Sequence, residues 1–315
     1  ATAQQLARQG HDVTLFEKDE RIGGLLRYGI PDFKLDKSCI DRRMDQMQAE
    51  GVTFRPGTNV GVDITAEQLT ADFDAVVLTM GAGAARDLPV PGRDLRGTYL
   101  AMDFLTQQNQ LNHGVTIDPA DRIDASGKTV IVIGGGDTGS DCVGTSNRQG
   151  ASKVYQFEIM PKPPARGETV EQWPDYPRFL RTSTSHEEGC ERDWNIMTKE
   201  LRGEGKLQQL VGCKVDWQEV DGRMTPVEVP GSEFTLDCDL IFLAMGFVHV
   251  QQDGIVTDLG CELDGRGNVQ TNDDWATSVD GVFAAGDAQR GASLVVHAIN
   301  EGRLCADAVG TFLKK

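Results

Sequence analysis

The chain has 315 residues, which is enough for two domains with sizeable cores, and it carries a formal net charge of −17. Such an acidic surface disfavours nucleic acids and anionic membranes as partners. No apolar run reaches the roughly 18 residues of a transmembrane helix, and no signal-peptide pattern opens the chain.

The first part of the chain is typical of the second half of a nucleotide-binding unit. Residues 1–9 are expected to form a helix ending at Gly10, and residues 12–17 a buried parallel strand. Residues 21–37 contain glycines and a proline and are expected to form a shaped loop, before a helix at 38–51 and a strand and turn at 52–61. We expect the natural chain to carry a further strand and a Gly-x-Gly-x-x-Gly loop upstream of Ala1.

The middle and end of the chain alternate strands with glycine-rich loops. Residues 73–92 predict an apolar strand and loop, 93–127 a connection with one helix, and 128–164 a strand, glycine loop, helix and strand. The proline-rich stretch 161–177 predicts an irregular loop in which Trp173 and Tyr176 cover the nucleotide, face a partner, or simply lie on the surface. Residues 194–238 alternate like an antiparallel layer, 239–247 form a strand, and 281–313 form a strand, turn and long helix.

The strongest motif is the stretch 134–139, which fits Gly-x-Gly-x-x-Gly and directly follows the apolar run TVIVI. Gly134 permits a tight turn, Gly136 lets the backbone approach a pyrophosphate, and Gly139 lets the helix pack closely on the strand. Asp137 and Thr138 would open that helix. The sequence therefore predicts a dinucleotide site here.

The choice between NADH and NADPH depends on the end of the next strand. Glu158 lies there, where an acid accepts a hydrogen bond from a ribose 2′-hydroxyl and repels a 2′-phosphate, so Glu158 favours NADH. Lys162 and Arg166 follow closely and could serve a 2′-phosphate. The choice stays open.

Two further acids indicate a second nucleotide, of the flavin kind. Glu17 ends the strand at 12–17, and Asp287 follows the strand of GVFAAGDA, where an acid can hydrogen-bond a ribityl chain. The helix that begins near residues 292–295 would place its N-terminus by a flavin ring. His297 in this helix could touch the ring or be an ordinary surface or packing histidine.

The cysteines are scattered and contain no Cys-x-x-Cys pair, which favours reduced thiols in a cytoplasmic protein and disfavours a zinc or iron–sulfur cage within this segment. It also disfavours thioredoxin-reductase chemistry, and Cys142 is expected to be a core thiol. The seven are Cys39, Cys142, Cys190, Cys213, Cys238, Cys261 and Cys305.

The chain resembles the small (beta) subunit of glutamate synthase and, more widely, the flavin disulfide-reductase-like superfamily. The resemblance is carried by FEKDERIGGLLRYGIPDFKLDK, VIGGGDTGSDCVGTSNRQGA, LIFLAMGF and VFAAGDAQRGASLVVHAINEGRLCADAV. It implies an α/β fold of two doubly wound Rossmann-like domains, with an NAD(P)H domain (121–248) inserted into a discontinuous FAD domain (1–120 and 249–315).

The resemblance also implies binding residues. Gly134–Gly139 and Glu158 would bind NAD(P)H, with no metal ligand and no acid–base residue required. The residues that it assigns to FAD are Glu17, Lys18, Gly24, Leu25, Leu26, Arg27, Val60, Gly81, Gly286, Asp287, Leu294, Val295 and Val296.

By this resemblance, hydride passes from NAD(P)H to FAD, and electrons leave through iron–sulfur clusters to a large (alpha) subunit that makes glutamate from glutamine and 2-oxoglutarate. The family's cysteine-rich cluster segment lies outside this sequence. The stretch after Glu158 lacks the paired arginines of many bacterial members, which favours NADH without deciding the choice. Two alternatives remain: a stand-alone reductase serving a ferredoxin or a pyrimidine, and a non-catalytic nucleotide-bound assembly subunit.

Overall fold

The computed structural model describes residues 1–165 and 179–314, so Arg166, Trp173 and Tyr176 lie outside the described part. The chain divides into two compact units. Unit 1 comprises residues 1–27, 32–86 and 246–315, and unit 2 comprises residues 28–31 and 87–245. The first boundary lies at Arg86, earlier than the expected residue 120, while the second lies close to the expected residue 248.

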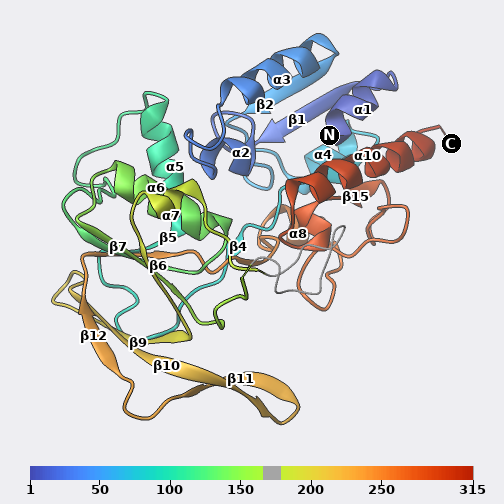
Figure 1. Ribbon diagram of the computed structural model, residues 1–315. Helices are drawn as coiled ribbons and strands as arrows, with labels where there is room; N and C mark the ends of the chain where they lie inside the picture. Colours follow the sequence, from blue (N-terminus) through green and yellow to red (C-terminus); the bar gives the residue numbers. More distant parts are fainter. Residues whose placement is uncertain (166–178, 315) are drawn as a thin grey trace. The chain divides into compact units, whose positions relative to one another are not determined.

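Unit 2 is built on a five-stranded parallel sheet in the order β5-β13-β6-β7-β8 (Figure 1). The short strand β5 pairs with β13, which explains why residues 87–120 belong to this unit. The strands are β5 (Thr98–Leu100), β6 (Thr129–Ile133), β7 (Lys153–Glu158), β8 (Glu191–Trp194) and β13 (Leu240–Leu243), and the helices are α5 (Ala101–Asn112), α6 (Asp137–Arg148) and α7 (Thr184–Glu187).

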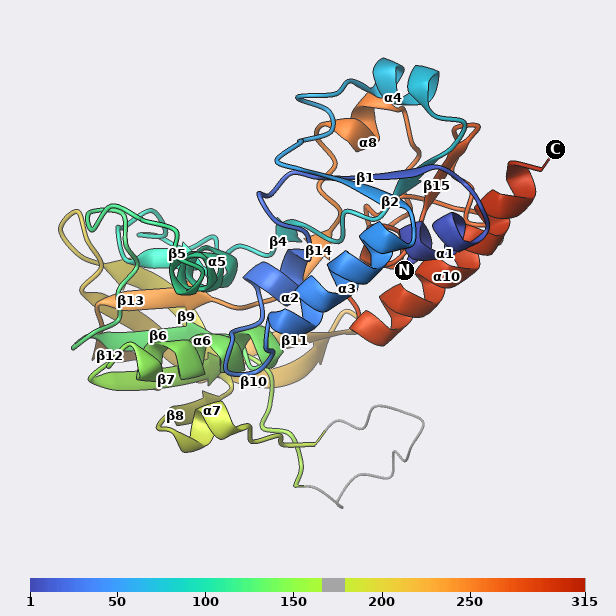
Figure 2. The same ribbon diagram turned by 90° about the horizontal axis from the view of Figure 1, so that it is seen from above.

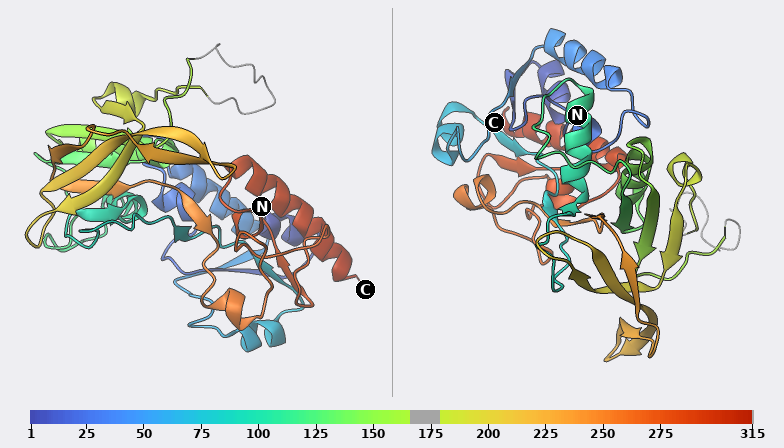
Figure 3. Two further views of the ribbon diagram at one scale, coloured as in Figure 1. Left: turned by 90° about the horizontal axis from the view of Figure 1, so that it is seen from below. Right: turned by 90° about the vertical axis from the view of Figure 1, so that its left-hand side faces the viewer.

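The two faces of this sheet bury different layers, because successive strand side chains point to opposite faces. On one face Val130 and Val132 of β6 pack under helices α5 and α6, where the rings of Phe104 and Phe242 stack with centroids 4.0 Å apart. On the other face Ile131 packs with residues of an antiparallel layer. Figure 1 shows α5 and α6 above the sheet and this layer below it; Figure 2 looks onto the helical side, and the left view of Figure 3 looks onto the layer.

The antiparallel layer confirms the pattern expected over residues 194–238. Its central strand β10 pairs antiparallel with each of its three neighbours. Its strands are β9 (Ile196–Arg202), β10 (Gln209–Val220), β11 (Arg223–Glu228) and β12 (Phe234–Asp237).

Unit 1 contains parallel pairs β1–β2 and β3–β15 and an antiparallel pair β4–β14. Two apolar clusters pack on opposite faces of β15. Val282 and Ala284 pack with residues of α4 and α8, and Phe283 packs with residues of α1 and α10. The elements are α1 (Thr2–Arg8), β1 (Val13–Glu17), α2 (Gly24–Tyr28), α3 (Ser38–Ala49), β2 (Val52–Pro56), α4 (Ala66–Asp72), β3 (Val76–Leu78), β4 (Ala84–Ala85), β14 (Phe247–His249), α8 (Ile255–Asp258), β15 (Val282–Ala284), α9 (Asp287–Arg290) and α10 (Val295–Phe312).

One expectation was wrong in detail, because residues 21–37 are not all loop. They include the short helix α2, which begins directly after Gly23 with a backbone φ of +136°. Glycine lowers helix propensity but tolerates this turn, so composition alone pointed to a loop.

Candidate functional site

The turn after β6 requires glycine at its first position. Gly134 has a φ of +121°, and a Cβ atom placed there would lie 2.1 Å from the carbonyl oxygen of Ala244. Its N–H donates to the carbonyl oxygen of Phe157 on the neighbouring strand (2.8 Å). The chain therefore turns sharply at the carboxyl edge of the parallel sheet, where ligands of such folds bind.

The other two motif glycines have opposite surroundings. A Cβ on Gly139 would lie 2.3 Å from the carbonyl oxygen of Gly134, so helix α6 packs directly on the turn. A Cβ on Gly136 would have no atom within 4 Å. Gly136 is also the N-cap of α6 and has no side chain to cap it, while Asp137 is exposed and Thr138 half-buried in the first turn. The first N–H groups of α6 thus lack intrahelical partners, as an anion site requires.

Glu158 ends β7 with its carboxylate beside the glycine turn. A Cβ on Gly135 would overlap this carboxylate, so the side chain lies against the loop. The indole N–H of Trp194 donates to Glu158 Oε1 (3.0 Å), and Arg192 Nη2 lies 3.9 Å from the same oxygen. Burial raises the pKa of the Glu158 carboxyl, although the charge of Arg192 and the hydrogen bond from Trp194 each lower it.

Strand β8 supplies two neighbours of Glu158 that the local sequence did not indicate, Arg192 and Trp194. The cationic groups of Lys162 and Arg192 each lie 5.1 Å from the centroid of the Trp194 ring. Positive charge thus lies close to the carboxylate, and cation–π contact holds it there. Only the parallel pairing of β8 with β7 reveals this arrangement.

In unit 1, Glu17 ends β1 in a comparable way. Its Oε1 accepts a hydrogen bond from the N–H of Asp19 (3.0 Å), and Lys18 is exposed beside it. Burial of the carboxylate raises the pKa of Glu17. Val60 is half-buried in the cluster under β15 and forms an isolated bridge with Ile64.

Helix α2 presents an open backbone and one buried cation. Gly24 has a φ of +49° and no atom within 4 Å of a Cβ position, while Leu25 is exposed and Leu26 half-buried. Arg27 is buried, donates from Nη2 to Asp41 (2.6 Å) and from Nε to the carbonyl oxygen of Ile22 (2.6 Å). Its Nη1 has no hydrogen-bond partner among the described residues, so it could still bind an oxygen of a ligand.

The turn after β15 joins an acid to an uncapped helix. Gly286 has a φ of +68°, and Asp287 begins α9, where its Oδ1 accepts a hydrogen bond from the Ser293 hydroxyl (2.8 Å). Leu294, Val295 and Val296 are 43%, 53% and 60% exposed at the start of α10, which has no side-chain cap. Gly81, three residues after the end of strand β3, has a φ of +79° and no atom within 4 Å of a Cβ position. His297 is exposed.

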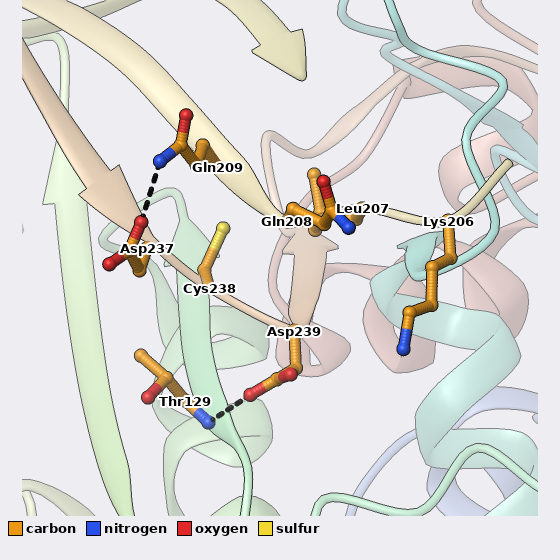
Figure 4. A pocket seen from close by; sticks show the side chains of 8 residues that line it. All are labelled: Thr129, Lys206, Leu207, Gln208, Gln209, Asp237, Cys238 and Asp239. Carbon is orange, nitrogen blue, oxygen red and sulfur yellow. Dashed lines mark hydrogen bonds between the residues drawn. The ribbon is translucent and has the colours of Figure 1, made fainter. Parts of the chain in front are cut away.

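A separate hollow of about 470 Å³ lies beside the opposite end of β6 (Figure 4). Its polar groups largely satisfy each other, since Gln209 Nε2 donates to Asp237 (2.7 Å) and the N–H of Thr129 donates to Asp239 (2.9 Å). Because it flanks the amino end of the strand, it is not the dinucleotide site that the glycine turn indicates.

Residues 1–165 and 179–314, which the structure describes, contain neither a metal-ligand cluster nor a membrane-spanning helix. No group of three or more His, Cys, Asp or Glu side chains there could hold a metal ion. No helix in those ranges is long and apolar enough to cross a bilayer.

All seven cysteines are free thiols, and only Cys39 is exposed. Burial raises the pKa of Cys238 and of Cys305 to about 12 and that of Cys190 to about 11.

Because the thiolate is the reactive species, titration of the folded protein with a chromogenic disulfide at pH 8 is expected to show one fast thiol, that of Cys39. The Cys39→Ser variant should lose this phase, and several fast thiols in that variant would contradict the burial seen here.

Comparison with known proteins finds similarity to pyridine-nucleotide oxidoreductases. The family model described as pyridine nucleotide-disulphide oxidoreductase matches residues 1–302. The chain is 54% identical to the glutamate synthase [NADPH] small chain of Mycobacterium tuberculosis, over 99% of this chain and 64% of that protein. It is 36% identical to the putative glutamate synthase [NADPH] small chain of Cereibacter sphaeroides, over 99% and 74% respectively.

Two further likenesses bear on the nucleotide and the fold. The chain is 41% identical to glutamate synthase [NADH] of Saccharomyces cerevisiae, over 99% of this chain and 15% of that protein. The structure of FprA from Mycobacterium tuberculosis in complex with NADPH matches with a TM-score of 0.75 at 18% identity, over 99% of this chain and 82% of that one. The likeness to FprA supports the fold alone. The chain spans less than two thirds of the length of the Mycobacterium tuberculosis glutamate synthase small chain.

Proposed function

Because the chain belongs to the pyridine nucleotide-disulphide oxidoreductase family, we propose that it is the NAD(P)H-oxidising, FAD-binding part of a glutamate synthase small subunit. The observation that carries this proposal is the 54% identity to a glutamate synthase small chain over 99% of the chain. The two nucleotide sites expected from the sequence would then serve NAD(P)H in unit 2 and FAD in unit 1.

In unit 2 the proposed role of the glycine turn is to hold the pyrophosphate of NAD(P)H. Gly136 leaves the space in front of α6 open, and the unpaired N–H groups of the first turn would donate to the phosphate oxygens. Glu158 would receive the ribose next to the adenine.

In unit 1 the residues fit a flavin nucleotide. Glu17 would accept from the adenosine ribose, Asp287 from the ribityl chain, and the N–H groups at the start of α10 would face the ring. The exposed apolar side chains Leu294 and Val296 would be covered by it. When bound, FAD supplies a two-electron acceptor for hydride from NAD(P)H. The chain contributes alignment and exclusion of water, because hydride transfer needs no side-chain acid or base.

The proposed partner is the large subunit of glutamate synthase, which would receive the electrons through iron–sulfur clusters held outside this segment and form glutamate from glutamine and 2-oxoglutarate. We place the complex in the cytoplasm. The test combines the natural full-length chain with the large subunit and measures glutamate formed per NAD(P)H consumed. Glutamate formation supports the proposal, whereas NAD(P)H oxidation that reduces only ferredoxin or a pyrimidine would favour a stand-alone reductase.

Replacing Glu158 with glutamine is expected to shift nucleotide choice toward NADPH. The change keeps the shape but removes the negative charge that opposes a 2′-phosphate, so the ratio of kcat/KM for NADPH to that for NADH should rise roughly tenfold. Rates of flavin reduction with each nucleotide measure it. Glu191→Gln on β8, an exposed carboxylate paired with Lys153, is the matched control. An unchanged ratio in Glu158→Gln would show that Glu158 does not meet the ribose.

A further inference from the structure

A line of three hydrogen bonds connects the glycine turn to helix α7. Gln156 on β7 is 1% exposed, and its Nε2 donates to the carbonyl oxygen of Gly134 (2.9 Å). Its Oε1 lies 2.8 Å from His186 Nε2. His186 Nδ1 in turn lies 3.0 Å from the backbone nitrogen of Ser183. Every member of this line is at least partly buried.

The chemistry of the groups fixes the direction of this line. The N–H of Ser183 can only donate, so His186 Nδ1 must accept, and in the neutral ring Nε2 then carries the proton. That proton is donated to Gln156 Oε1, which leaves the amide NH₂ for the carbonyl oxygen of Gly134. Ser183 therefore determines the tautomer of His186, and His186 determines the orientation of the Gln156 amide.

The carbonyl oxygen at the end of this line is the one on which helix α6 rests. A Cβ on Gly139 would lie 2.3 Å from it and 2.8 Å from Gln156 Nε2. Rotation of the Gly134–Gly135 peptide would break the hydrogen bond from Gln156 to this oxygen and would turn the Gly135 N–H in the opposite direction. The hydroxyls of Ser140 and Ser183, 2.6 Å apart, give a second tie between α6 and the start of α7.

We propose that Gln156 and His186 are positioning residues that hold the glycine turn in the form that receives the dinucleotide pyrophosphate. Neither side chain needs to touch the nucleotide; both act through the carbonyl group of Gly134. The proposal deepens the function proposed above and rests on unit 2 binding NAD(P)H. It assigns a role to a buried glutamine in the middle of a parallel strand, where an apolar residue is the norm.

The test compares Gln156→Met, which keeps the length but cannot donate, with His186→Phe, which leaves the Gln156 amide without its donor. Gln149→Met is the matched control, because Gln149 also makes two side-chain hydrogen bonds in unit 2, to Ala125 and Gln108, but lies at the other end of α6. Calorimetric titration gives the Kd for NADH and NADPH, and hydrogen exchange without nucleotide gives the protection of residues 134–140.

Gln156→Met is expected to raise Kd about tenfold and to speed exchange at residues 134–140, with the rate of flavin reduction at saturating nucleotide changed less than twofold. His186→Phe should raise Kd and speed the exchange by smaller factors, and it tests the inference if Gln156→Met fails to fold. Gln149→Met should change neither Kd nor the exchange rates. Unchanged Kd and exchange in the folded variants, or equal changes in Gln149→Met, would overturn the inference. A wild-type protein that binds neither nucleotide would instead overturn the proposed function.

Discussion

The Gly136→Ala variant is expected to bind NADH and NADPH at least tenfold more weakly than the wild type while keeping its thermal stability. Gly136 has a φ of −77°, which alanine adopts without strain, and no atom lies within 4 Å of the added methyl group. The methyl group would instead occupy the open space before α6, where the pyrophosphate must approach the helix N–H groups. Titration calorimetry and a thermal melt measure the two effects separately, and tenfold corresponds to about 1.4 kcal/mol.

The Gly139→Ala variant is the contrasting control, because its methyl group meets protein rather than open space. Its Cβ would lie 2.3 Å from the carbonyl oxygen of Gly134, so α6 must move and stability should fall by about 1–3 kcal/mol. Normal nucleotide affinity in Gly136→Ala would mean that the pyrophosphate does not approach this turn.

The Arg290→Met variant is expected to destabilise unit 1 by about 3 kcal/mol and to lower its flavin content. Arg290 Nε donates to Glu301 Oε1, and the Glu301 side chain is only 4% exposed against 48% for Arg290. Removing the cation leaves a carboxylate on α10 that is buried without its charge partner, and Glu301 Oε2 already has no hydrogen bond among the described residues. Because Arg290 ends α9, the turn that carries Asp287 should loosen as well.

Urea unfolding followed by fluorescence, together with the flavin content after purification, measures both effects. The double variant Arg290→Met with Glu301→Gln is the control, since it removes the buried charge and should recover most of the lost stability. Equal losses in the single and double variants would show that the cost comes from packing rather than from the unpaired carboxylate.

The glycine turn was predictable because its determinants are adjacent in sequence. An apolar run, three glycines at fixed spacing and a helix are enough to specify a strand, a turn and an open helix N-terminus. The structure then shows different physical demands at each glycine: a positive φ at Gly134, close packing at Gly139 and open space at Gly136.

The surroundings of Glu158 could not be predicted, because they arise from pairing between distant segments. Trp194 and Arg192 reach Glu158 only because β8 aligns in parallel with β7. Nothing in the local sequence of β8 marks it as a neighbour of the glycine turn. The same holds for Gln156 and His186, which are thirty positions apart.

The contribution of residues 87–120 to unit 2 is hidden in the sequence for a similar reason. Strand β5 has only three residues, too few for a periodic pattern, and its membership in the sheet follows from pairing with β13. In unit 1, helix α2 escaped prediction because its first residue is glycine and its length is five residues.

Flavin reduction tests the central claim most directly. The natural full-length protein is purified, its visible spectrum is recorded, and NADH or NADPH is added without oxygen. If one chain binds both FAD and NAD(P)H, the protein should absorb near roughly 450 nm, the region of an oxidised flavin. This absorbance should fall rapidly after addition of at least one of the two nucleotides, because hydride reduces the flavin. A flavin that stays oxidised with both nucleotides would contradict the proposed oxidoreductase function and favour a non-catalytic assembly subunit, and a colourless protein would contradict the assignment of FAD to unit 1.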